Sequence, residues 1–528
     1  MAEFDWSFPY PSQRMPVLAE NVVATSQPLA AQAGLRMLLD GGNATDAALA
    51  AAIALTVVEP TSNGIGSDAF AIVWDGERLH GLNASGRSPA ALTPGHFAGR
   101  TSIPRRGWDP VTVPGAVSAW AELSQRFGRL PFERLFEPAI RYAADGYPVS
   151  PIIGRGWQGA AKTFADFPAF LETFCPDGRA PNPGERFRSP DHARTLREIA
   201  ETNGESLYRG ELARRIADHA AETGGLLTAD DLAAHTADPV EPISVGYRGL
   251  ALHEIPPNGQ GIAALIALGI LANRPVDDFP VDSADSLHVQ IEAMKLAFAD
   301  AHRHVADPGH MELSPADLLA PDYLAERAGL IDMARAGEPT FGLPRGRDTV
   351  YLTAADAAGM MVSFIQSNYY GFGSGVVIPG TGIALQNRGL GFTLEPGHPN
   401  QVGPGKRPYH TIIPAFITRG GEPVASFGVM GGPMQPQGHV QLVVRLADHR
   451  QNPQAAIDAP RWRVQTGRQV LLERGTSGEV IDELRSRGHE VEMAGPAAFG
   501  GAQFIGRLDG GGYLAASEPR KDGQAVGW

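Results

Sequence analysis

The segment GRDTVYLTAAD, residues 346–356, places Thr349 between a charged, glycine-containing stretch and a run of strand-forming residues. A threonine hydroxyl is a weak nucleophile at neutral pH and needs an adjacent base. An α-amino group, whose pKa is about 7.7–8.0, can be that base, but only when the threonine is the first residue of a chain. The segment therefore predicts a cut between Asp348 and Thr349. The alternative is an ordinary strand threonine, since β-branched residues favour strands.

Two further features could complete such a site. Ser367, in SFIQSNYYGFGSG, follows Thr349 by one strand and a turn, so antiparallel pairing would bring the two hydroxyls together. The segment GVMGGP places Gly431 and Gly432 after an apolar strand and before a helix. Two successive N–H groups there can stabilise an oxyanion, and glycine lets a substrate approach the backbone closely. Each feature alone is weak, because a strand serine and a glycine turn are the ordinary alternatives.

The elements expected around these residues form a layered α/β fold. Residues 28–42 predict a helix, and residues 44–60 predict a second helix that is apolar nearly all round and therefore buried. Residues from about 110 to 340 are mainly helical, whereas the chain after Thr349 begins with hairpins. The stretch 334–347, rich in glycine and proline, predicts an exposed, flexible linker. We expect a mainly antiparallel sheet core covered by helices.

Length and charge limit the class of protein. The chain has 528 residues, which is enough for roughly two to four domains' worth of core. A net charge of −14 without a long run of one sign argues against nucleic acid, whose phosphates require a basic face. The single cysteine, Cys175, excludes an intrachain disulfide and a cysteine-cluster metal site. Because neither a secretory signal nor a run of about 20 apolar residues is found, we expect a cytoplasmic protein that does not bind membranes.

Many motifs along the chain match one family, in order. The chain resembles the γ-glutamyltransferase (γ-glutamyltranspeptidase, glutathione hydrolase) family of self-processing N-terminal-nucleophile hydrolases over nearly its whole length. The motifs that carry this resemblance are GNATDAALAAAIALTVVEP (42–60), VTVPGAVSAW (111–120), EIPPNGQG (254–261), EAMKLAFAD (292–300), DTVYLTAAD (348–356), GFGSG (371–375), PGTGIALQN (379–387), GPGKRP (403–408), GVMGG (428–432), AAIDAPRW (455–462) and ASEPRKDGQAVG (516–527).

The resemblance implies a fold and a chemistry. It implies a four-layer αββα sandwich made from one self-cleaved precursor, whose large subunit (1–348) and small subunit (349–528) stay wrapped together. Thr349 matches the family's nucleophile, Ser367 stands where the family has a threonine that hydrogen-bonds the nucleophile, and Gly431–Gly432 match the oxyanion-hole pair. The implied reaction is hydrolysis, or transfer, of the acyl group of a small carboxylate-bearing amide through an acyl-threonine ester, without a cofactor. The expected partners are that small-molecule amide and the two processed subunits for each other.

The substrate-binding positions depart from the family pattern. Arg388 stands where the family has a glutamine, Gly391 where it has an aspartate that binds the substrate's ammonium, and Ser85 where it has a carboxylate-binding arginine. A site that gains an arginine and loses an aspartate favours an anion, because an unpaired buried ammonium would cost several kcal/mol. Arg388 can hold a carboxylate through two parallel hydrogen bonds, and the alternative is an ion pair with a core carboxylate. The other residues expected to bind substrate are Arg87, Tyr369, Asn387, His410 and Thr411.

These departures leave the acyl group open. They favour a smaller or deaminated acid amide over glutathione, as in the oxamate amidohydrolases and cephalosporin acylases of the family. Both γ-glutamyl or glutathione-type and oxamate-type substrates therefore stay as candidates. The alternative to an enzyme is an uncleaved, non-catalytic homologue that acts as a binding or scaffold protein. The sequence is compatible with a homo-oligomer.

Three histidines after a predicted helix raise the question of a metal. His302, His304 and His310 lie in AHRHVADPGH. Ligands at positions i and i+2 do not share a helix face, and no carboxylate motif supports them. We therefore expect no metal site.

Overall fold

The computed structural model describes residues 14–339 and 348–528. Two stacked antiparallel sheets form the centre of the protein, and we name these sheets the β10 sheet and the β15 sheet. The β10 sheet contains, in spatial order, β21 (Gln524–Gly527), β2 (Val22–Thr25), β10 (Asp348–Ala355), β11 (Met361–Tyr369), β3 (Asp68–Trp74), β4 (Leu79–Asn83) and β7 (Asp238–Val240). The β15 sheet contains β1 (Val17–Ala19), β20 (Tyr513–Ser517), β19 (Gly501–Arg507), β15 (Glu422–Met430), β14 (Ala415–Arg419), β9 (Leu250–Glu254) and β8 (Ile243–Tyr247).

The two sheets face each other across an apolar core. Phe70 and Tyr351 from the β10 sheet and Phe416 and Ile505 from the β15 sheet belong to one buried cluster. Alternating side chains of each strand reach this core, while the opposite faces are covered by helices. This packing places the β10–β11 hairpin against β15, the strand that leads into the helix of residues 434–447.

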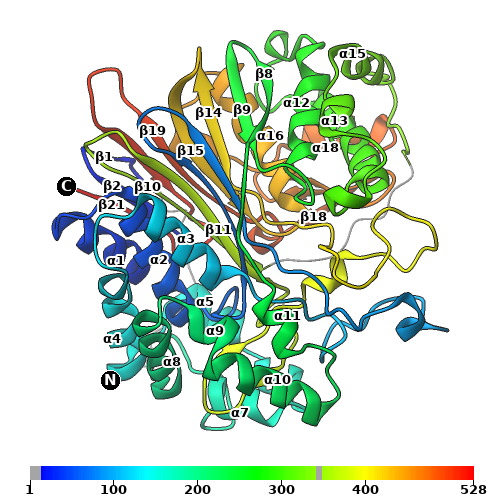
Figure 1. Ribbon diagram of the computed structural model, residues 1–528. Coiled ribbons are helices and arrows are strands. Elements are labelled where there is room, and N and C mark those ends of the chain that lie inside the picture. The colour runs from blue at the N-terminus through cyan, green and yellow to red at the C-terminus, as the bar shows by residue number, and fades with distance from the viewer. Residues whose placement is uncertain (1–13, 340–347) are drawn as a thin grey trace.

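Helices cover the outer face of each sheet, which gives four layers. Figure 1 shows α1 (Pro28–Leu39) and α2 (Ala44–Val58) outside the β10 sheet, and α12 (Gly261–Ala272), α13 (Ala284–His304) and α16 (Met434–Ala447) on the other side, beyond the β15 sheet. Every residue of α2 is buried, as its apolar sequence predicts. The predicted αββα sandwich is confirmed.

The hairpin after Thr349 forms as the sequence predicts. β10 and β11 pair antiparallel, with Val350 opposite Gln366 and Asp348 opposite Tyr369. The register shifts between Asp348 and Val350, so that Thr349 on β10 lies opposite two residues of β11, Ser367 and Asn368. Such an irregularity changes the direction of the side chains beside it, and this one lies where β10 begins and β11 ends.

Strands from both sides of position 348 share each sheet. In the β10 sheet, β10 and β11 lie between β2 and β3, which come from the first part of the chain. In the β15 sheet, β14 pairs with β9 of the first part and with β15 of the second. A cut before Thr349 would therefore leave both sheets continuous. The predicted linker 334–347 falls partly outside the described residues, because 340–347 are not among them.

Candidate active site

Thr349 is buried at the edge of the two-sheet core and contacts Ser367. Its exposed fraction is 1%, and its Oγ1 donates a hydrogen bond to Ser367 Oγ over 3.2 Å. Ser367 Oγ also accepts a hydrogen bond from the Tyr369 backbone N–H over 2.8 Å. The antiparallel hairpin thus brings together the two hydroxyls that the sequence analysis pairs, and the backbone fixes the orientation of the second one. Their catalytic roles stay a prediction.

Gln435 is a third side chain at Thr349, and sequence reasoning missed it. It lies in the first turn of α16, and its Nε2 donates to Thr349 Oγ1 over 3.4 Å. Its Oε1 accepts the Ile413 N–H over 2.9 Å, which fixes the amide orientation. The only signal in the sequence was its position three residues after the glycine pair, at the start of a helix.

Gly431 and Gly432 form the turn between β15 and α16. Both have positive φ, +125° and +61°, and a Cβ on Gly431 would lie 3.0 Å from Gly500 Cα. The Gly432 carbonyl accepts hydrogen bonds from the Gln435 N–H and from Gln260 Nε2, over 3.1 and 2.9 Å. In the described part of the chain, neither glycine N–H takes part in a hydrogen bond. Two donors at the N-terminus of a helix are therefore available to an anion.

Arg388 is fully buried in the short helical turn Arg388–Gly391 and is only partly satisfied. Its Nη1 donates to Thr411 Oγ1 over 2.7 Å, and its guanidinium carbon lies 4.5 Å above the Tyr369 ring. Within the described residues Nη2 has no hydrogen-bond partner, and Nε lies 3.8 Å from Asp68 Oδ2. Burial lowers the pKa of Arg388 to about 10, opposed by Asp68, so the side chain is still charged at neutral pH. Both sequence interpretations are thus present in part: an ion pair to a core carboxylate, and a donor free for a ligand.

Asp68 is the core carboxylate beside Arg388, and no local sequence signal marked it. Burial raises the pKa of Asp68 to about 7, while Arg388 acts in the opposite direction. His410 Nε2 lies 3.0 Å from Asp68 Oδ2, and its Nδ1 accepts the Ile412 N–H over 3.4 Å. Burial, with a smaller effect of Arg388, lowers the pKa of His410 well below its usual range. The neutral imidazole therefore donates from Nε2 to Asp68.

The remaining predicted substrate residues have other partners. Asn387 Oδ1 accepts the Tyr370 N–H over 3.1 Å, and its Nδ2 donates to the carbonyls of Arg105 and Gly373 over 3.0 and 3.2 Å. Arg87 Nη1 donates to Asp307 Oδ2 over 2.9 Å. Asn387 thus joins the backbones of Arg105, Tyr370 and Gly373, and Arg87 forms an ion pair at the surface. Whether either side chain contacts a substrate stays a prediction.

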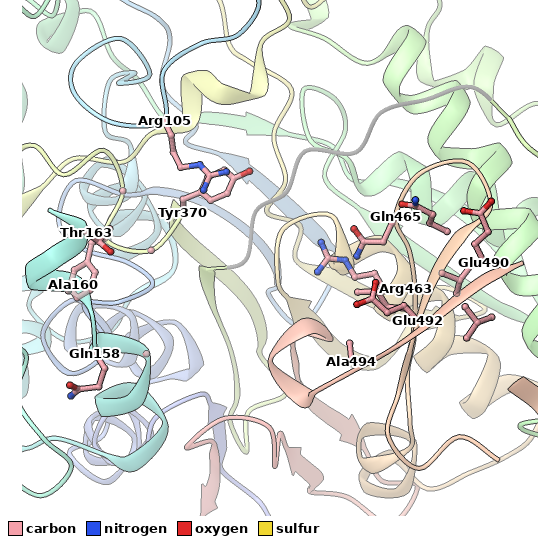
Figure 2. A pocket seen from close by; sticks show the side chains of 18 of the residues that line it. Arg105, Gln158, Ala160, Thr163, Tyr370, Arg463, Gln465, Glu490, Glu492 and Ala494 are labelled. Atoms are coloured by element: carbon pink, nitrogen blue, oxygen red, sulfur yellow. The ribbon is translucent and has the colours of Figure 1, made fainter. Parts of the chain in front are cut away.

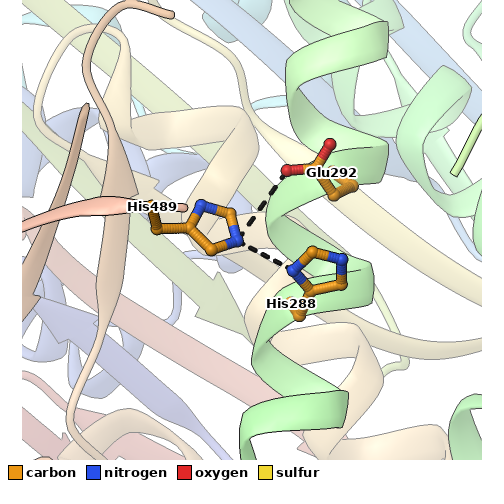
Figure 3. Close-up of side chains that lie close together, drawn as sticks. All are labelled: His288, Glu292 and His489. Atoms are coloured by element: carbon orange, nitrogen blue, oxygen red, sulfur yellow. Dashed lines mark hydrogen bonds and ion pairs between the residues drawn. The ribbon is translucent and has the colours of Figure 1, made fainter. Parts of the chain in front are cut away.

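A different set of residues from the three histidines considered above could hold a metal. His288 and Glu292, one turn apart on α13, lie with His489 so that one ligand atom of each falls within 4.8 Å of the others (Figure 3). His489 Nε2 lies 2.8 Å from His288 Nδ1 and 3.8 Å from Glu292 Oε1. Lys295 Nζ, however, donates to Glu292 Oε1 over 2.8 Å. A divalent ion would have to displace that ammonium, so we describe the group as a hydrogen-bonded cluster.

The comparisons with known proteins decide the family. The model of the γ-glutamyltranspeptidase family matches residues 30–528. The chain belongs to this family. It is 38% identical to the glutathione hydrolase-like YwrD proenzyme of Bacillus subtilis, over 96% of this chain and 98% of that protein. It is also 38% identical to the oxamate amidohydrolase proenzyme of Klebsiella pneumoniae, over 95% and 97%.

A solved structure agrees with the sequence comparisons. The crystal structure of a cephalosporin acylase from Bacillus halodurans is 51% identical and superimposes with a TM-score of 0.95, over 100% of this chain and 99% of that one. The named relatives are hydrolases, amidohydrolases and acylases. This γ-glutamyltranspeptidase homologue is therefore an amidohydrolase that acts on amide bonds. Within residues 14–339 and 348–528, no helix is both long and apolar enough to cross a bilayer.

Proposed function

We propose that this amidohydrolase cuts its own chain before Thr349 and then uses Thr349 as the nucleophile. The observation that carries the proposal is the contact between Thr349 Oγ1 and Ser367 Oγ, where the beginning of β10 lies beside the end of β11. In the precursor, Oγ1 attacks the Asp348 carbonyl carbon, and the acyl group moves from nitrogen to oxygen. Water then hydrolyses that ester, which leaves a free amine on Thr349. The names of two relatives as proenzymes support this step.

The mature site would then hydrolyse an amide in two steps. Thr349 Oγ1 attacks the substrate carbonyl while its own amine accepts the proton, and the N–H groups of Gly431 and Gly432 hold the oxyanion. The C–N bond breaks, the leaving amine takes the proton, and an acyl-threonine ester stays behind. Water attacks the ester and releases the acid. Ser367 and Gln435, which contact Oγ1, keep it oriented through both steps.

Arg388 determines which acyl groups the site would accept. A buried guanidinium with an unused Nη2 is suited to bind a carboxylate, because a charged hydrogen bond in a dry site is strong. The substrate we propose is therefore an amide of a small dicarboxylic acid, of the oxamate or γ-glutamyl kind. The oxamate amidohydrolase and cephalosporin acylase among the relatives support this class. A substrate ammonium would meet Arg388 without a carboxylate at Gly391, so we place γ-glutamyl compounds second.

Mass spectrometry of the purified protein tests the nucleophile. We expect two chains whose masses sum to that of the 56.0 kDa precursor, the larger roughly twice the smaller, with Thr349 at a new N-terminus. Thr349→Ala should leave one uncut, inactive chain. Thr353→Ala is the matched control, because Thr353 is buried on the same strand with a side-chain partner of its own, Ser426. Activity from an intact wild-type chain would refute the mechanism, and an intact chain without activity would favour the scaffold alternative.

A panel of amides tests the acyl group. We expect turnover of oxamate, glutaryl anilide or both, and slower turnover of γ-glutamyl anilide and glutathione. Preference for the γ-glutamyl compounds would show that Arg388 does not set the specificity. A hydroxylamine trap, which captures acyl esters, should reduce the yield of free acid if the acyl-threonine forms.

A further inference from the structure

Asp68 lies in one row with Thr349 and Ser367, across three neighbouring strands. Thr349 on β10 contacts Ser367 on β11 through their hydroxyl groups, which are 3.2 Å apart. Ser367 in turn lies directly opposite Asp68 of β3 in the antiparallel register. Directly opposite residues of such a pair project from the same face of the sheet, with Cβ atoms about 4.5–5.5 Å apart. A fully buried carboxyl group therefore lies one strand away from the proposed nucleophile and its partner.

The same carboxyl group faces the guanidinium that is proposed to bind the substrate. Asp68 Oδ2 lies 3.8 Å from Arg388 Nε and 3.0 Å from His410 Nε2. Asp68 Oδ1 accepts the Gly86 N–H over 3.3 Å. Because Asp68, Arg388 and His410 are all fully buried, water screens their charges weakly. A change of charge on Asp68 is therefore felt strongly at Arg388.

Two charged and two neutral groups face Asp68 from the elements packed against it. Burial raises the pKa of Asp68 to about 7, opposed by Arg388 and Arg407. His410 is neutral, because burial lowers its pKa well below the usual range. Tyr208, on α9 (Glu205–Arg209), is neutral because burial raises its pKa. Of these described groups, Asp68 is the one whose charge changes near neutral pH.

A large cavity lies outside this buried group. Its volume is about 1240 Å³, and Figure 2 shows Arg105 on one wall and Arg463 on the opposite wall. Among the described residues that line the cavity there is neither Thr349, nor Arg388, nor Asp68. The charge balance at Asp68 is therefore set by the buried groups named above.

Two carboxylates would share one guanidinium when a substrate binds. Ionised Asp68 and Arg388 together carry no net charge, and a substrate carboxylate would add one negative charge to this buried pair. Two carboxylates in one site disfavour each other's ionised form. A single proton on one of them restores neutrality.

We propose that Asp68 takes up one proton from solvent when the acyl carboxylate binds Arg388, so that recognition of the substrate is linked to protonation of this carboxyl group. The inference rests on the proposed function, in which Arg388 binds that carboxylate. In the free enzyme the partner of Arg388 is ionised Asp68. In the complex the partner is the substrate, Asp68 is neutral, and the proton returns to solvent when the acid leaves. Asp68 is thus a positioning residue that acts on specificity through Arg388.

The pH dependence of substrate preference tests this linkage. The assay measures kcat/KM of the processed wild-type enzyme for glutaryl anilide and for butyryl anilide, between about pH 6 and 9. Both reactions use the Thr349 amine, so the ratio of the two values cancels its titration. The glutaryl carboxyl group, with a pKa close to the glutamate value of about 4.3, stays ionised throughout. Because Asp68 must bind a proton above its pKa of about 7, the ratio should be constant well below that pH and fall by up to about tenfold per pH unit above it.

Asp68→Asn assigns the effect to this residue. The amide has the shape of the protonated carboxyl group but does not ionise, so the ratio should lose its pH dependence and, at about pH 9, exceed the wild-type ratio by roughly tenfold or more. Mere damage to the site would lower the ratio or leave its slope in place. Asp300→Asn is the matched control, because Asp300 is a buried aspartate 2.9 Å from Arg327 whose pKa burial also raises. This control should keep the wild-type slope.

Proton uptake gives a measurement that needs no variant. Titration calorimetry of the wild-type enzyme with glutarate and with butyrate, in two buffers of different ionisation enthalpy, should show greater uptake with glutarate, by up to about one proton near pH 8. Equal uptake, a ratio that stays constant at all pH values, or a slope that persists in Asp68→Asn overturns this inference, while a glutaryl preference at every pH leaves the proposed function intact. If no carboxyacyl amide is hydrolysed at any pH, the proposed function fails and the inference fails with it.

Discussion

Replacing Arg388 gives the most direct measure of how the acyl carboxylate is bound. Arg388→Met removes a fully buried guanidinium but keeps an unbranched side chain of similar length. A substrate carboxylate would then lie buried without its partner. Breaking a buried ion pair in this way costs about 3–5 kcal/mol, so kcat/KM for a carboxyacyl amide should fall by about two to four orders of magnitude.

The assay compares glutaryl anilide with butyryl anilide, whose acyl group carries no carboxylate. We expect kcat/KM to fall for the glutaryl compound only, because the butyryl chain has no carboxylate to pair with Arg388. Arg388→Lys should fall between wild type and Arg388→Met, since a lysine keeps the charge but cannot form the bidentate contact. The variant's thermal midpoint must be recorded, because Thr411 Oγ1 and Asp68 also lose a partner. An unchanged kcat/KM for the glutaryl compound, or an equal loss for both anilides, would refute the reasoning.

Three further predictions follow from the same site. Ser367→Ala should lower kcat about tenfold with little change in KM, because Thr349 Oγ1 and the Tyr369 N–H both lose a hydrogen-bond partner, while Ser367→Thr should restore most of the rate. Equal losses in Ser363→Ala, a buried serine on the same strand, would contradict this. Gly431→Ala should lower kcat about 10²–10³-fold, since its φ of +125° disfavours a side chain and a Cβ would lie 3.0 Å from Gly500 Cα. Gly420→Ala, at a turn with open space around it, should keep a kcat near the wild-type value. Steady-state kinetics of the two variants measures both effects, and equal losses of kcat would contradict the prediction. Asp68→Asn should change the pH dependence of stability, measured by urea unfolding in the uncut Thr349→Ala background. Because burial raises the pKa of Asp68 to about 7, the folded chain keeps a proton that the unfolded chain loses near pH 4, so the free energy of unfolding of the parent falls by up to about 4 kcal/mol between pH 4 and 7. Asp68→Asn lacks this contribution, and an identical fall in both proteins would show that Asp68 is not the titrating group.

The parts of the site that could be predicted from sequence are those set by local patterns. The hairpin that pairs Thr349 with Ser367 is read from strand-forming runs on both sides of a short turn, and the glycine pair from its place between a strand and a helix. These signals act over a few residues. The sequence therefore predicts the two hydroxyls and the oxyanion donors before any tertiary contact is known.

The parts that could not be predicted depend on contacts between distant segments. Asp68 is the first residue of β3, directly after a glycine-rich segment, and only the fold brings it beside Arg388 and His410. The cluster of His288, Glu292 and His489 likewise joins one helix to a segment about 200 residues later. Departures from a family pattern marked Arg388 as unusual, but the carboxylate beside it could not be found in the same way, because nothing local distinguishes a buried aspartate from a surface one.

Strands from before and after position 348 alternate within the sheets, and this arrangement has a consequence for how the cut protein would unfold. An uncut chain that unfolds can return to its native state alone, whereas two separated pieces must first meet again, at a rate that depends on concentration. Each piece lacks strands from both halves of the sandwich, so neither holds a complete core when isolated. Thermal unfolding would therefore be irreversible in practice once the chain is cut. The lifetime of the active enzyme would depend on the rate at which its two pieces first separate, rather than on an equilibrium between folded and unfolded forms.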